Sequence, residues 1–141
     1  MSHLVELPVR FGHVDQARIV YYPHFFHFCH EAMEVTFAEA VGVSYPDVLN
    51  RDRLGFPAVH IETDFANPAG FGETLRIAVS VAALGRTSVT FAFDATRASD
   101  GESVFRARIV TVCVDMTTFT PVAVPPRYRE AFERLGAPGA A

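Results

Sequence analysis

The sequence predicts an α+β fold in which one long helix packs across a curved antiparallel sheet of about five strands. One segment, residues 23–42, repeats its apolar residues at helical spacing. Five other segments alternate apolar and polar residues, as strands with one buried face do. Because the chain offers no second long helix, the helix must bury its apolar face against the sheet. A chain of 141 residues, 50% of them hydrophobic, fits a single domain over residues 1–141.

The chain begins with a predicted strand, residues 4–11, which leads through a loop into the long helix. Pro23 suits the first helical turn, where its missing N–H would have no partner anyway, and Gly42 is a residue that commonly ends a helix. Between them, apolar side chains recur every three or four residues and form one face. They are Phe25, Cys29, Ala32, Met33, Thr36, Phe37 and Ala40.

The remaining elements follow the helix in a regular order. A short helix at residues 45–50 and a charged loop at 51–53 come first. Strands are then predicted over residues 56–66, 73–84, 88–98 and 102–116, separated by Gly-, Pro-, Asn- and Asp-containing turns. A last helix is expected over residues 127–135, and residues 136–141 are expected to be frayed. The expected inward residues of the strands are Val5, Leu7, Val9 and Phe11, then Val59, Ile61, Thr63 and Phe65, then Leu75, Ile77, Val79, Val81 and Ala83, then Val89, Phe91, Phe93 and Ala95, and finally Phe105, Ala107, Ile109 and Thr111.

Short turns between the last four strands predict that these strands form an antiparallel meander. A strongly curved sheet of this kind around one helix is a hotdog fold. Such a sheet leaves a strand edge open, and pairing two edges across a two-fold axis would cover both. The expected assembly is therefore a homodimer, or a homotetramer built as a dimer of dimers.

Composition and charge exclude several classes of function. The formal net charge is −4 without a basic stripe, so we expect no nucleic-acid partner. All basic residues are arginine, which excludes Schiff-base chemistry on lysine. Residues 77–84 form the longest apolar run and are too few to cross a bilayer. Residues 1–11 lack the pattern of a signal peptide, and Cys29 and Cys113 are expected to be buried thiols, so the predicted location is the cytoplasm, away from membranes.

Asp15 is the first candidate for chemistry because it lies just before the predicted helix. A carboxylate near a helix N-terminus has two ordinary roles. It can tie the loop by accepting hydrogen bonds from nearby backbone, or it can act on a substrate that the free N–H groups of the helix hold. The residues alone leave both roles open.

Residues 11–23 read Phe-Gly-His-Val-Asp-Gln-Ala-Arg-Ile-Val-Tyr-Tyr-Pro and resemble the signature of the 4-hydroxybenzoyl-CoA thioesterase family of hotdog enzymes. Residues 29–34 also resemble the helix of the 1,4-dihydroxy-2-naphthoyl-CoA thioesterase branch. The resemblance implies an acyl-CoA thioesterase without a cofactor, with an acyl-CoA as its substrate. It implies that the Asp15 carboxylate attacks the thioester or activates water. It also implies that the Tyr22 backbone N–H polarises the thioester carbonyl, which suits the charge that develops there.

Three positions depart from the family pattern or refine it. Arg18 replaces a family glycine, so either the loop shifts or the arginine faces the ligand. Tyr22 stands where relatives that act on short aliphatic acyl groups often have histidine, which favours an aromatic acyl group. His30 stands where the 4-hydroxybenzoyl branch has an acidic residue beside the aryl group.

The substrate-binding candidates fall into two groups. Aromatic residues and one histidine near the helix start are expected to line the acyl site: Tyr21, Phe25, Phe26 and His30. Arg86 and Ser88 lie in a turn that resembles the family hairpin contacting the CoA phosphates, a ligand that an arginine fork suits.

Three alternatives accompany this interpretation. His24, His27 and His30 recur every three residues and raise the possibility of a zinc site, but a single helix offers no converging partner, so we expect no metal. A hotdog 3-hydroxyacyl dehydratase would need a catalytic histidine, for which His13 and His60 are the candidates. A non-catalytic subunit that binds acyl-CoA or an acyl carrier would not need Asp15.

Overall fold

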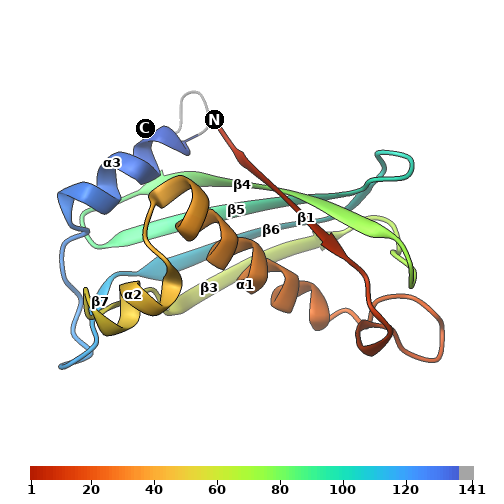
Figure 1. Cartoon of the computed structure of the whole chain (residues 1–141), viewed down its shortest axis with the longest axis horizontal. Helices are drawn as coiled ribbons and strands as arrows, with labels where there is room; N and C mark the ends of the chain where they lie inside the picture. Colours follow the sequence, from red (N-terminus) through yellow and green to blue (C-terminus); the bar gives the residue numbers. More distant parts are fainter. Residues whose placement is uncertain (137–141) are drawn as a thin grey trace.

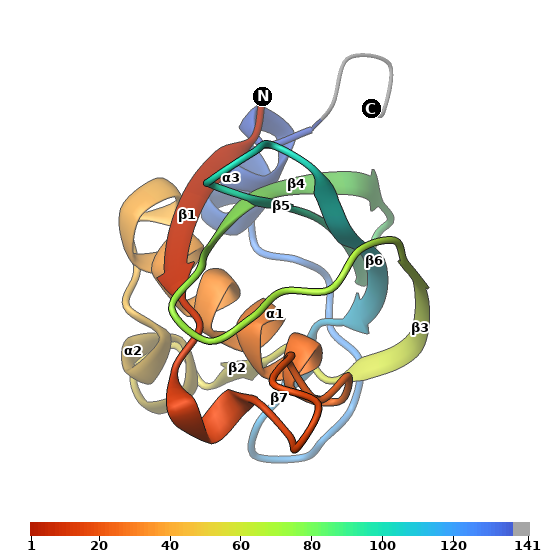
Figure 2. The same cartoon turned by 90° about the vertical axis from the view of Figure 1, so that its right-hand side faces the viewer.

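A computed structural model describes residues 1–136 of the chain and confirms the predicted hotdog fold. The long helix α1 (His24–Thr36) continues into a π-helical turn, η2 (Phe37–Val41), and a curved sheet wraps around both (Figures 1 and 2). Gly42 ends the helix in a left-handed conformation with φ 86°, as predicted. No helix within these residues combines the length and the apolar composition that crossing a membrane requires. The end expected to be frayed begins at Gly136, which instead bridges to Val81, and residues 137–141 lie outside the described residues.

Five antiparallel strands form the sheet, in the order β1-β4-β5-β6-β3. Their bounds are β1 (His3–Pro8), β3 (Ala58–Phe65), β4 (Thr74–Leu84), β5 (Ser88–Arg97) and β6 (Ser103–Val112). The hairpins β4–β5 and β5–β6 are those predicted from the turns. The predicted four-strand meander is wrong at its first step, because β3 pairs with β6 at the edge of the sheet and β1 takes the place beside β4.

The connection from β3 to β4 explains this difference. Residues 66–73 do not turn back as a hairpin but cross the open end of the curved sheet, from one edge to the other (Figure 2). Ala69, in the middle of the crossing, is fully buried and accepts a hydrogen bond from the Val20 N–H at 2.8 Å. The Val9 N–H donates to the Glu73 carbonyl at 2.8 Å. The crossing therefore closes the end of the sheet where α1 begins.

The core lies between α1 and the concave face of the sheet. The inward residues predicted for β5 and β6 are all buried. On α1 the predicted face is largely right, but Met33 and Ala40 are only partly buried, and Phe28, which the spacing did not select, is fully buried. Ala83 is exposed because the register of β4 shifts after Val81.

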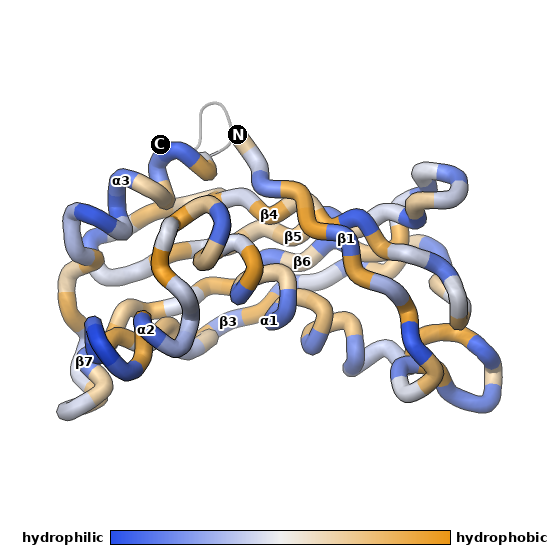
Figure 3. Tube along the Cα trace, in the orientation of Figure 1, coloured by the Kyte–Doolittle hydropathy of each residue, from blue (hydrophilic) through white to orange (hydrophobic). Residues whose placement is uncertain are grey.

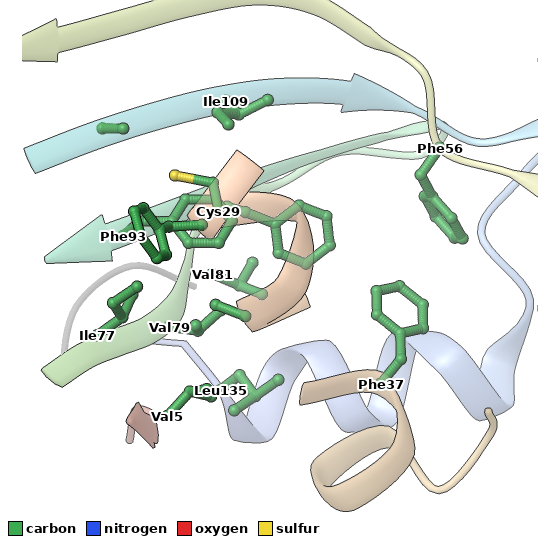
Figure 4. Packing of buried hydrophobic residues seen from close by; sticks show 14 of the residues in the cluster. Val5, Cys29, Phe37, Phe56, Ile77, Val79, Val81, Phe93, Ile109 and Leu135 are labelled. Atoms are coloured by element: carbon green, nitrogen blue, oxygen red, sulfur yellow. The ribbon is translucent and has the colours of Figure 1, made fainter. Parts of the chain in front are cut away.

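An aromatic cluster fills the other end of the core, beneath α3 (Pro126–Arg134). The Phe37 ring lies 5.6 Å from Phe56 and 5.8 Å from Phe132, and Figure 4 shows Phe37 and Phe56 facing each other. Hydrophilic residues recur along α3 in Figure 3, while Tyr128 and Phe132 on its inner side are buried. The Tyr128 hydroxyl donates to Asp52 and ties α3 to the segment after α2 (Tyr45–Asn50).

Two further predictions about strands are wrong. The strand expected over residues 102–116 breaks at Cys113, whose N–H donates to the Thr87 carbonyl. The chain then forms a separate two-stranded sheet from β7 (Val114–Asp115) and β2 (Leu54–Gly55). The expected inward faces also fail at two places: Phe11, beyond the end of β1, is 78% exposed, and the apolar residues of β3 lie at the surface.

Candidate active site

The segment that carries Asp15 is a narrow loop in front of α1. After the single turn η1 (Phe11–His13), Val14 pairs with Val20, and the Asp15 N–H donates to the Ile19 carbonyl at 3.1 Å. Ile19 also bridges to Gly70 in the crossing segment. The loop is thus held both by its own backbone and by the segment that closes the sheet, at the right-hand end of Figure 1.

The Asp15 side chain is exposed and makes one local hydrogen bond. Its Oδ1 accepts from the Ala17 N–H at 2.8 Å, the turn contact that loop aspartates commonly make. Within residues 1–136, the second carboxylate oxygen accepts no hydrogen bond. Asp15 therefore shapes the loop with one oxygen and leaves the other free to act on a substrate.

Arg18 adopts the backbone conformation for which a glycine is suited. Its φ is 68°, in the left-handed region, and its N–H donates to the Asp15 carbonyl at 2.9 Å. A residue with a Cβ pays about 1 kcal/mol or more in this region. Of the two outcomes considered from the sequence, a shifted loop is not needed: the loop takes the glycine-type turn with an exposed arginine in it.

The start of α1 leaves one backbone donor unused beside this loop. The His24 N–H donates to the Tyr21 carbonyl and the Phe25 N–H to the Tyr22 carbonyl, at 2.9 and 3.1 Å. Pro23 has no N–H, and the Tyr22 N–H finds no acceptor in the part of the chain that the structure describes. A free N–H at the positive end of a helix is suited to hold an oxygen that gains negative charge.

The aromatic side chains around the helix start divide into surface and core. The Tyr21 and Tyr22 rings are 48% and 59% exposed and lie 5.6 Å apart. Phe25, in contrast, is buried against Phe105 at 4.8 Å, and Phe26 is half-buried. Phe65 of β3 joins the two groups, at 6.0 Å from Tyr22 and 5.7 Å from Phe25. An aromatic surface formed by Tyr21, Tyr22 and Phe65 therefore lies next to the free Tyr22 N–H.

A cavity of about 330 Å³ lies along α1, between the helix and strands β5 and β6. Its volume is in the range of small-molecule sites. Its floor is apolar, with Cys29, Phe93 and Ile109, and Figure 4 shows Cys29 beside Phe93. His30 and Glu34 line it with polar atoms. Sequence reasoning missed Glu34, Phe93 and Ile109 as cavity residues, because a strand pattern signals burial and not the space left beside it.

Two histidines of α1 lie close to His13 where the loop meets the helix. The His13 ring lies 6.1 Å from His24 and 6.3 Å from His27, and packs on Phe28 at 4.5 Å. Burial, more than any neighbouring charge, lowers the pKa of His13, so this ring is neutral near pH 7. Within residues 1–136, no three His, Cys, Asp or Glu side chains converge as metal ligands would.

Arg86 and Ser88 lie at the other end of the sheet from Asp15. β4 spans the two ends, from Thr74 near the Asp15 loop to Leu84 next to the Arg86 turn, and its 11 residues cover about 35 Å. Arg86 is exposed, and its carbonyl accepts from the Val124 N–H at 2.9 Å. A single chain therefore brings Asp15 and Tyr22 to one end and does not bring Arg86 to them.

Comparisons with known proteins identify the family and the fold. Residues 9–132 match the thioesterase-like superfamily. The chain is 30% identical, over 123 residues, to a 1,4-dihydroxy-2-naphthoyl-CoA hydrolase of Synechococcus elongatus, covering 86% of this chain and 88% of that one. Its fold is similar to a 1,4-dihydroxy-2-naphthoyl-CoA thioesterase from Synechocystis, with a TM-score of 0.86 at 22% identity over 96% and 98% of the two chains. It is also similar to a gentisyl-coenzyme A thioesterase, with a TM-score of 0.80 at 23% identity over 90% and 99%.

The conformation of Arg18 predicts an order of stability between two substitutions. Arg18→Gly and Arg18→Ala both remove the guanidinium, but only glycine adopts the left-handed turn without a Cβ clash. We expect the glycine variant to have the higher free energy of unfolding, by about 1 kcal/mol, in urea titrations. Equal stability of the two variants would show that the loop does not hold residue 18 in this conformation in solution.

Proposed function

Since the chain belongs to the thioesterase-like superfamily and is a thioester hydrolase, as its sequence predicted, we propose that it hydrolyses aromatic acyl-CoA esters. The observation that carries the proposal is that Asp15 and Tyr22, in the same segment before α1, each keep a polar group without a partner within residues 1–136. An exposed carboxylate with one free oxygen stands in the loop that leads into a helix start with one free donor. Thioester hydrolysis needs these two groups, one for the carbonyl carbon and one for the carbonyl oxygen.

The proposed mechanism assigns one step to each group. The Tyr22 N–H binds the thioester oxygen and stabilises the charge it gains as the carbon becomes tetrahedral. Asp15 either attacks the carbon itself, giving an anhydride that water then cleaves, or takes a proton from the water that attacks. In both routes the C–S bond breaks, CoA leaves as a thiolate that takes up a proton, and the acid is released.

Support for an aromatic acyl group comes from the surface around this pair. The exposed rings of Tyr21, Tyr22 and Phe65 offer flat faces on which a planar group can stack. The relatives named above act on naphthoyl and gentisyl thioesters, which are aromatic. His30, in the cavity along α1, is proposed as a polar contact for the acyl group, while Phe25 and Phe26 are proposed to support the ring surface from behind.

A panel of CoA esters tests this proposal. We expect the specificity constant for benzoyl-CoA to exceed that for butyryl-CoA by roughly tenfold or more, since a few apolar contacts supply about 1–3 kcal/mol. Thiol release, followed with a chromogenic reagent under one set of conditions, measures both. A ratio below one would remove the aromatic part of the proposal, and no hydrolysis of any ester would remove the thioesterase itself.

We also propose that two copies pair through β3. Val59, Ile61 and Phe65 expose 61%, 45% and 50% of their surface on an edge strand, which is a surface that invites another strand. Antiparallel pairing of two β3 edges would place the Arg86 end of one subunit beside the Asp15 end of the other. Arg86 and Ser88 would then contact the CoA phosphates of the partner's site, in a homodimer or a dimer of dimers.

The cytoplasm is proposed as the location, and both cysteines support it. Cys29 and Cys113 are free and buried, as expected in a compartment that keeps thiols reduced. The single domain over residues 1–141 stays a prediction.

Asp15 offers a substitution that separates its two roles. In Asp15→Asn the amide oxygen can still accept from the Ala17 N–H, so the turn is kept while the charge is lost. We expect unchanged unfolding and a turnover number lower by about two to four orders of magnitude, the usual contribution of a positioned acid or base. Initial rates of thiol release at saturating ester measure the turnover number, and thermal unfolding measures the stability.

Two further variants serve as controls for Asp15→Asn. Asp15→Ala removes both the turn contact and the charge, so it should lose stability as well as turnover. Glu133→Gln, at an exposed position of α3, removes a carboxylate elsewhere and should leave turnover intact. If Asp15→Asn kept a third of the wild-type rate, Asp15 would be only a turn residue.

Pairing through β3 predicts the effect of a charge on that edge. Ile61→Lys should give a monomer in analytical ultracentrifugation, because a lysine on the strand blocks close pairing. Activity should fall with the loss of the dimer if each site needs both subunits. Leu4→Lys is the matched control, since Leu4 has a similar exposure, 48%, on β1 at the opposite edge of the sheet. A dimeric Ile61→Lys protein would refute this interface.

A further inference from the structure

Two residues at the Arg86 end of the sheet share the unusual backbone conformation of Arg18. Arg53 and Phe119 have φ values of 58° and 57°, although neither is glycine. They lie in neighbouring segments, just before β2 and just after β7, which pair with each other. We call residues 53–55 and 114–120 the β2–β7 corner. Left-handed non-glycine residues persist where the surrounding structure holds them, and they concentrate at ligand sites.

Hydrogen bonds hold the corner in this shape. The Met116 N–H donates to the Arg53 carbonyl at 2.9 Å, and Arg53 Nη2 donates to Thr117 Oγ1 at 3.2 Å. The Phe119 N–H donates to the Asp115 carbonyl at 2.7 Å, and Asp115 Oδ1 accepts from the Thr117 N–H at 2.7 Å. The turn is therefore fixed from both sides.

The fixed turn exposes the aromatic ring of Phe119. Phe119 is 67% exposed, at the tip of a turn, where it adds nothing to the core. The chain thus carries two costs here, a strained backbone and an exposed phenyl group. Both costs are offset if a ligand covers the ring.

Arg53 belongs to this corner, and Arg86 lies in the turn next to it. The corner adjoins the Arg86 turn through the Cys113 N–H, which donates to the Thr87 carbonyl at 2.7 Å. In residues 1–136, neither Arg53 nor Arg86 has a carboxylate within ion-pair distance. Asp115, an acidic side chain of the corner, has its Oδ1 engaged by the Thr117 N–H. Within residues 1–136, the corner and the adjoining turn therefore each offer a guanidinium group that forms no ion pair.

We propose that Phe119 stacks on the adenine of coenzyme A, while Arg53 joins Arg86 in binding its phosphates. This inference rests on the proposed acyl-CoA substrate and on the proposed pairing of two subunits through β3. The nucleotide end of coenzyme A combines a flat purine with a diphosphate and a 3′-phosphate. An exposed aromatic ring binds the purine by stacking, and arginine side chains bind the phosphates.

Position in the fold supports the same assignment. The corner lies at the left-hand end of Figure 1, next to the start of β3, while the Asp15 loop lies at the right-hand end. Two subunits paired antiparallel through β3 bring one corner toward the other subunit's loop. The corner thus lies farther from the reacting carbon than Tyr22 does, where the nucleotide of a bound thioester belongs.

Calorimetric titration of the protein with free coenzyme A tests the proposal without any reaction. Phe119→Ala should weaken binding about five- to tenfold or more, the range for loss of one base–aromatic stack. Phe119→Trp should restore it, because tryptophan also stacks, whereas Phe119→Leu should not. Arg53→Ala should weaken binding and reduce its dependence on salt. Arg76→Ala, an exposed arginine on β4, is the matched control and should bind as the wild type does.

Kinetics supply the second readout. With benzoyl-CoA, Phe119→Ala should raise KM and leave kcat unchanged, since the nucleotide lies far from the reacting bond. With the benzoyl ester of pantetheine, which lacks the nucleotide, the same variant should behave as the wild type. Equal KM changes on both esters, or no change on either, would overturn the proposal.

One structural explanation competes with the proposal. If Phe119 instead packs on the partner subunit, Phe119→Ala should lower the dimer's stability in ultracentrifugation and affect both esters alike, which would overturn it. A wild type that binds coenzyme A but hydrolyses no ester would refute the proposed function alone. In that case the titration series would still decide the role of Phe119.

Discussion

Burial of one face of α1 by the curved sheet is the constraint on which the rest of the structure depends. Phe28, Cys29 and Ala32 have no exposed surface, so the helix cannot slide or rotate without opening the core. This fixes where the helix begins, at the end of the sheet that the segment from β3 to β4 closes. The free Tyr22 N–H is therefore held in place by packing remote from it, as a preorganised donor must be.

The parts of the fold that the sequence could predict are those where local pattern and burial agree. Alternation along β5 identified Phe91 and Phe93 as inward, because both neighbours of β5 are hairpin partners. The same alternation along β3 was misleading: Val59 and Ile61 repeat like core residues but lie on an exposed edge. Strand order failed for a related reason. A turn sequence indicates that the chain bends, while the curvature of the sheet decides whether it returns beside the same strand or crosses to the other edge.

For the candidate site, a motif located Asp15 and Tyr22, but no pattern could locate what surrounds them. The left-handed conformations of Arg53 and Phe119 occur within the hydrogen bonds of the β2–β7 corner, and neither residue type gives warning of them. Cavity residues such as Glu34 and Ile109 become neighbours only when the helix lies across the sheet. The distance between Arg86 and Asp15 likewise depends on the length and direction of β4. The family motifs at these two residues do not reveal it.

Cys29 illustrates how burial also controls reactivity. Its thiol lines the cavity along α1, and desolvation raises its pKa to about 12. Near pH 7 this thiol therefore stays protonated. The thiolate is the reactive form of cysteine, so a thiol held in its protonated form is a poor nucleophile. The apolar surroundings of Cys29 therefore suppress its reactivity as well as bury it.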